Sequence, residues 1–158
     1  MLRAILFLGF FLISFAYSMW RGGAPERLAA MLLLAALIGS TSAGVFRLPG
    51  GFTSVPIALA LVDLLLGIAL VALAVRANRL WPIPLAACQL ITVLAHAAKL
   101  AAPQMFAGGY ALLIAISAWP IMGILMFGAY CHRRRIKAGH RDRPWKHSSR
   151  AMEPTARS

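Results

Sequence analysis

The chain has 158 residues, of which 61% are hydrophobic and only 13% are charged, and its net charge is +12. Soluble domains average about half apolar and about a quarter charged residues, so this composition excludes an ordinary soluble domain and indicates a membrane protein. Nine of the 16 Lys and Arg residues follow Cys131, so the charge indicates a basic tail, and no nucleic-acid-binding face is expected.

Five apolar runs follow one another along the chain, and each is close to the ~20 residues that a helix needs to cross a bilayer. They cover about residues 4–20, 28–46, 57–75, 83–99 and 110–130. Short segments that contain Gly, Pro and basic residues separate them. We therefore predict an all-α integral membrane bundle of five transmembrane helices within residues 1–131, followed by a basic, disordered tail at 132–158.

The first run fits two interpretations, a retained transmembrane helix and a cleaved signal peptide. Ala16 and Ser18 resemble a small-x-small cleavage site, whereas Trp20 and Arg21 end the run as an interface anchor does. The positive charges favour the helix, because five crossings place 13 Lys and Arg residues on one side and three on the other. The positive-inside rule then puts the N-terminus outside and the C-terminus in the cytoplasm.

Small residues recur on the second and third runs at spacings that let helices approach closely. In the second run Ala35, Gly39 and Ala43 fall four residues apart, and in the third Gly67 shares a face with Asp63. Such rows support helix association in lipid, although an alanine-rich helix also produces them by chance.

The third and fourth runs form a predicted hairpin that carries polar residues at membrane depth. Folding residues 57–100 about the turn at 76–82 places Asp63 opposite His96. On the fourth run the polar residues lie within an arc of roughly 80° at ~100° per residue. They are Gln89, Thr92, His96 and Lys99. The sequence thus predicts an intramembrane polar cluster of Asp63 with these four residues.

Asp63 needs a partner in the membrane, because a charged side chain at the bilayer centre costs at least ~2.5–3.5 kcal/mol. Three roles fit: a structural pair with His96 or Lys99, a proton or ion relay with His96, and a docking face for another subunit. Only one histidine lies at membrane depth, which argues against haem held by two imidazoles. Cys131 and His132 have no zinc-binding spacing, so neither a metal nor a cofactor is expected.

Basic residues gather where the fifth run ends. They are Arg133, Arg134, Arg135 and Lys137. A basic residue at a membrane surface gains about 1 kcal/mol from anionic lipid, so we predict that this group binds anionic headgroups. Binding of an acidic partner protein, or weakly of an RNA, is the alternative.

Four segments read FAY at 15–17, WRGGAPER at 20–27, RANRLWP at 76–82 and QLITVLAH at 89–96. Together they resemble small uncharacterised multi-pass inner-membrane proteins of alphaproteobacteria. The resemblance covers residues 1 to about 135, and the basic tail is longer than such proteins usually carry. It implies a bacterial inner membrane and brings no activity with it.

Two functions are expected from these features. The first is non-enzymatic, an accessory or assembly subunit that packs beside a larger membrane complex, with the lipid bilayer and other membrane subunits as partners. The second is a small oligomeric transporter or channel with a proton or ion relay at Asp63 and His96. A lipid-active enzyme ranks last, because no recognisable catalytic motif supports it.

Overall fold

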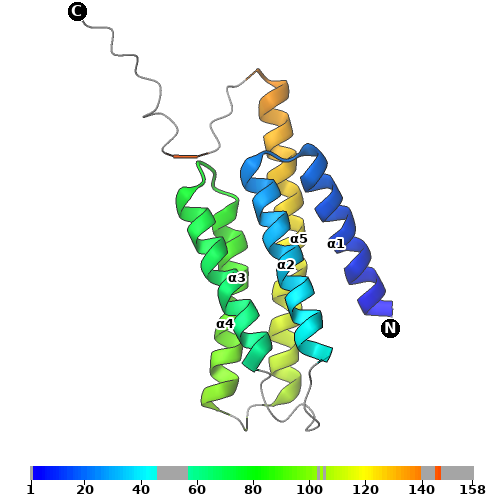
Figure 1. Ribbon diagram of the computed structural model, residues 1–158, viewed down its shortest axis with the longest axis vertical. Helices are drawn as coiled ribbons and strands as arrows, with labels where there is room; N and C mark the ends of the chain where they lie inside the picture. Colours follow the sequence, from blue (N-terminus) through cyan, green and yellow to red (C-terminus); the bar gives the residue numbers. More distant parts are fainter. Residues whose placement is uncertain (1, 46–56, 103, 105, 140–144, 147–158) are drawn as a thin grey trace, which may run out of the picture.

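The computed structural model describes residues 2–45, 57–102, 104, 106–139 and 145–146 (Figure 1). These residues form five α-helices: α1 (Leu2–Arg21), α2 (Ala24–Val45), α3 (Ile57–Arg76), α4 (Pro82–Ala101) and α5 (Ala107–Lys137). All five are long and apolar enough to span a membrane. The prediction of an all-helical chain with five apolar helices is confirmed.

Two helix boundaries differ most from the sequence-based expectation. α2 begins at Ala24 rather than near residue 28, because Glu26 lies in its first turn and is fully buried instead of facing solvent from a loop. α5 continues to Lys137, so residues 132–137, which were assigned to the tail, are helical. Cations are favoured at a helix C-terminus, which accounts for this extension. The predicted disorder of 140–144 and 147–158 lies outside the described residues.

The helices form a closed ring in which each packs against the next, and α5 also packs against α1. α2 and α5 touch across the ring. The α1–α2 connection, the α3–α4 turn and the last turns of α5 all lie at one end of the bundle (Figure 1). We call this end the basic end, after the cations that its elements carry: Arg21, Arg76, Arg79, Arg133, Arg134, Arg135 and Lys137.

The middle of the bundle is an apolar core. Leu70 of α3, Leu85 of α4 and Leu125 of α5 are at most 1% exposed. The outward faces are apolar as well, and Leu94 and Ile116 remain more than half exposed. Soluble proteins rarely expose apolar surface of this extent, whereas helices in lipid do so as a rule.

The small residues of the second and third helices do not all serve one interface. A Cβ on Gly39 would lie 3.3 Å from Val62 of α3, so Gly39 lies at the contact between α2 and α3. Gly67 has the same role against Val93 of α4, at 3.4 Å. Ala35 is exposed, and the side chain of Ala43 lies outside the described residues. The Ala35 side of α2 is therefore left for lipid or for another helix.

Candidate functional site

Asp63 and His96 meet as the hairpin register required. His96 Nε2 lies 2.9 Å from Asp63 Oδ2, and His96 Nδ1 lies 2.7 Å from the Tyr110 hydroxyl. Gln89 Nε2 donates to Asp63 Oδ1 at 3.0 Å and also reaches the Asp63 backbone carbonyl at 3.2 Å. We call Asp63, Gln89, His96 and Tyr110 the Asp63–His96 cluster.

The polar atoms of the Asp63–His96 cluster are paired with one another. Both ring nitrogens of His96 have partners, Nδ1 in the Tyr110 hydroxyl and Nε2 in Asp63, and Gln89 donates to the second carboxylate oxygen. The His96 side chain is only 3% exposed, while that of Asp63 is 18% exposed. The cluster is thus hydrogen-bonded internally and reaches the surface through Asp63 and Tyr110.

The other two predicted members of the polar cluster lie on the buried face of α4 that also carries Gln89 and His96. They are Thr92 and Lys99, each 6% exposed. Thr92 Oγ1 lies 2.7 Å from Ser117 Oγ of α5, which in turn donates to the Ile114 carbonyl. Thr92 therefore joins α4 to α5 rather than to Asp63. Lys99 is buried on this stripe one turn beyond His96.

Tyr110 and Ser117 were missed from the sequence, although a signal for both was present. α4 and α5 form a second hairpin, and folding it about residue 104 places His96 opposite residue 112, within one turn of Tyr110, and Thr92 opposite residue 116, next to Ser117. The same register argument that found Asp63 would have found both α5 residues. Tyr110 was instead read only as the first residue of the fifth run.

A second buried polar cluster lies at the basic end. Glu26 is fully buried, and its Oε1 accepts a hydrogen bond from Trp81 Nε1 at 2.9 Å and lies 3.3 Å from Arg79 Nη1. Arg79 Nη2 lies 3.2 Å from His132 Nδ1. Gly23 N–H donates to Glu26 Oε2 at 3.1 Å. We call these five residues the Glu26–Arg79 cluster.

The Glu26–Arg79 cluster was not predicted, because its members come from three segments far apart in the chain. One local signal existed: Glu26 follows Gly23 by three residues, the spacing at which a Glu side chain reaches back to cap a helix start. A Cβ on Gly23 would lie 2.8 Å from His132 Cε1, so a side chain at this position would force the His132 ring to shift. The cluster thus ties the start of α2 to the α3–α4 turn and to α5.

The chain beyond α5 returns to the basic end of the bundle. Lys146 N–H donates to the Arg76 carbonyl at 3.1 Å, and Trp145 pairs with Ala77 as an isolated antiparallel bridge. Trp145 also packs against the apolar core from this end. The described part of the tail therefore covers the α3–α4 turn.

The two clusters lie toward opposite ends of the bundle, and an apolar layer separates them. The buried side chains that α3, α4 and α5 place between them are all apolar. They are Leu66, Leu70, Leu73, Leu85, Ala86, Ile121, Met122, Leu125 and Ala129. The polar stripe of α4 thus ends inside the bundle at Gln89.

The predicted headgroup-binding residues occupy the last turns of α5. Arg134 and Lys137 are exposed, while Arg133 and Arg135 are half-buried. In the described part of the chain, no three His, Cys, Asp or Glu side chains come together as a metal site would require. Comparisons with protein-family models, with curated proteins and with solved structures found no match.

Proposed function

We propose that this chain is a multi-pass protein of a bacterial inner membrane and acts as a non-enzymatic accessory or assembly subunit beside a larger membrane complex. The observation that carries the proposal is the apolar layer between the two polar clusters. An ion or proton path would need polar groups or water across that layer, whereas the buried side chains that α3, α4 and α5 place there are apolar. Both clusters instead join helices to one another, which suits a static packing unit.

The proposed orientation places the basic end in the cytoplasm and the N-terminus outside. Its support is the concentration of Arg and Lys at that end, which the positive-inside rule assigns to the cytoplasm. A reporter enzyme that works only in the cytoplasm should be active when fused after Ser158. Activity of a periplasm-only reporter at that position would reverse the orientation.

The Ala35 side of α2 is the proposed contact with a larger subunit. Ala35 is an exposed small residue at mid-helix, and small residues let a second helix backbone approach closely in lipid. Gly39 and Gly67 already serve contacts within the chain, so they are not available to a partner.

The alternative is a small oligomeric transporter with a relay at Asp63 and His96. The continuous hydrogen-bonded series from Tyr110 through His96 to Asp63 favours it, because Asp63 and Tyr110 both keep some exposure. The two proposals are separated by proton flux into vesicles that contain the purified chain. The accessory-subunit proposal predicts no flux above empty vesicles. Flux that Asp63→Asn abolishes would refute it in favour of the transporter.

A further inference from the structure

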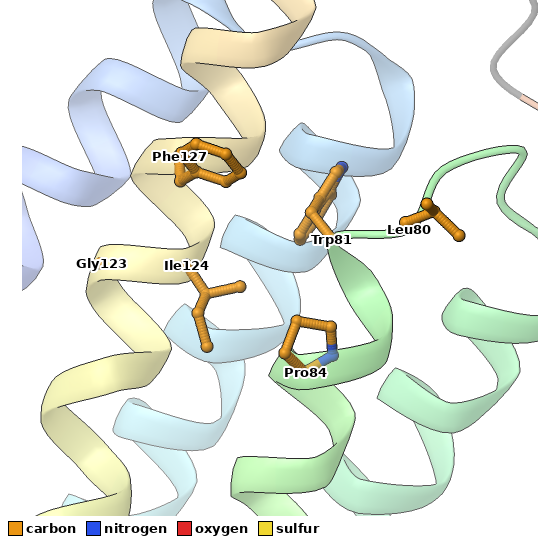
Figure 2. Close-up of a pocket in the computed structure, with 6 residues that line it drawn as sticks. All are labelled: Leu80, Trp81, Pro84, Gly123, Ile124 and Phe127. Atoms are coloured by element: carbon orange, nitrogen blue, oxygen red, sulfur yellow. The ribbon is translucent and has the colours of Figure 1, made fainter.

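An apolar groove of about 550 Å³ opens on the outside of the bundle between α4 and α5, near the basic end. Figure 2 shows the six lining residues: Leu80, Trp81, Pro84, Gly123, Ile124 and Phe127. This volume is within the range of ~300–1,000 Å³ that small-molecule sites occupy. The groove is separate from both polar clusters except for Trp81, which forms one wall with its ring and donates to Glu26 with its nitrogen.

The walls of the groove are fixed by contacts within the chain. The hydrogen bond to Glu26 holds the indole of Trp81. A Cβ on Gly128 would lie 2.6 Å from Trp81 Cδ2, so the absence of a side chain there lets the ring lie directly on α5. A Cβ on Gly123 would meet nothing within 4 Å, which leaves the floor open. A groove with held walls can favour one shape of occupant through van der Waals contact.

A cation stands on the same face of α5 as the groove. At ~100° per residue, Arg134 is seven residues after Phe127 and lies within roughly 20° of it around the helix. Its Cα is about 10 Å further toward the basic end, at ~1.5 Å per residue. Arg134 is exposed. Arg133, by contrast, points roughly 120° away from Phe127 by the same geometry.

We propose that the groove holds one acyl chain of an anionic phospholipid, whose phosphate is bound by Arg134. The inference rests on the proposed membrane insertion but not on the accessory role. Arg134 lies beyond the groove in the direction of the basic end, which is where a headgroup phosphate lies when an acyl chain of the same lipid occupies the groove. A guanidinium can donate two parallel hydrogen bonds to a phosphate. Lipid tails are as apolar as the groove, so apolar contact alone does not favour one lipid over another. The fixed shape of the groove and the charge of Arg134 must supply the preference for an anionic phospholipid.

The test is native mass spectrometry of the full chain, stripped of lipid in mild detergent and given phosphatidylglycerol or phosphatidylcholine with the same acyl chains. The wild type should retain one phosphatidylglycerol and little phosphatidylcholine. Gly123→Leu should lose the bound lipid, because the new side chain fills the groove. Gly109→Leu is the matched control on the same helix, since a Cβ there also meets nothing within 4 Å.

The charge is tested by a second pair of variants, both in the last turns of α5. Arg134→Gln should weaken retention about fivefold, equivalent to the ~1 kcal/mol per basic residue at an anionic surface. Arg133→Gln should weaken it less. Inorganic phosphate should not displace the lipid, because phosphate alone does not fill the groove. Undiminished retention by Gly123→Leu, or equal weakening by the two Arg variants, would overturn the proposal.

Discussion

His96 uses both ring nitrogens on side chains of other helices, Asp63 of α3 and Tyr110 of α5. Removing Asp63 or His96 alone therefore leaves a buried polar group without a partner. We expect Asp63→Leu and His96→Leu each to lower the free energy of unfolding by about 1–3 kcal/mol. The double variant should lose less than the sum, because neither Asp63 nor His96 is then left facing a missing partner.

Thermal unfolding of the four proteins in one detergent measures this coupling between Asp63 and His96. A double variant whose loss equals the sum of the single losses would show that the two residues do not act as a pair. The structural role of the cluster would then be wrong.

Glu26 is the most deeply buried acid among the described residues; it accepts hydrogen bonds from Gly23 and Trp81 and forms an ion pair with Arg79. Glu26→Gln keeps the shape but removes the charge opposite the Arg79 guanidinium. Breaking a buried ion pair costs about 3–5 kcal/mol, so we expect a large drop in the unfolding temperature. The neighbouring Arg27 is exposed, and Arg27→Gln should change stability by less than ~0.5 kcal/mol. Similar unfolding temperatures for the two variants would contradict the assigned role of Glu26.

Among the helices, α5 carries two glycines five residues apart with opposite surroundings. A Cβ on Gly128 would lie 2.6 Å from the Trp81 ring, while one on Gly123 would meet nothing within 4 Å. Because Glu26 holds the ring, Gly128→Ala should destabilise the bundle by about 1–3 kcal/mol. Gly123→Ala should be neutral or stabilise α5 by up to ~1 kcal/mol, through its higher helix propensity.

Circular dichroism during heating compares the two alanine variants directly. If Gly128→Ala unfolded at the same temperature as Gly123→Ala, the close approach of Trp81 to α5 would be wrong.

The sequence was most informative where two helices are joined by a short turn. Residues 57–100 form such a hairpin, so counting from the turn at 76–82 was enough to bring Asp63 to His96. The Glu26–Arg79 cluster needed contacts among residues 23–26, 79–81 and 132, and no local count connects these segments. α2 was placed four residues late for the same reason, since only tertiary partners make a buried start at Glu26 acceptable.

Taken as one molecule, the described chain is a ring of five apolar helices with a polar cluster toward each end, and α3, α4 and α5 bury only apolar side chains between the clusters. Each cluster joins three segments: the Asp63–His96 cluster joins α3, α4 and α5, and the Glu26–Arg79 cluster joins α2, the α3–α4 turn and α5. α1 contributes no side chain to either cluster as defined here. This arrangement fits a rigid unit that other membrane subunits pack against.

The central claim is that the chain works as part of a larger membrane complex. The most direct measurement is the native mass of the protein, purified in a mild detergent through a tag after Ser158. The account predicts larger partners in fixed stoichiometry, and it predicts that Ala35→Leu on the outer face of α2 reduces them. Ala115→Leu, at an exposed alanine of α5, serves as the matched control. A wild-type chain that purifies only as a homo-oligomer would contradict the claim.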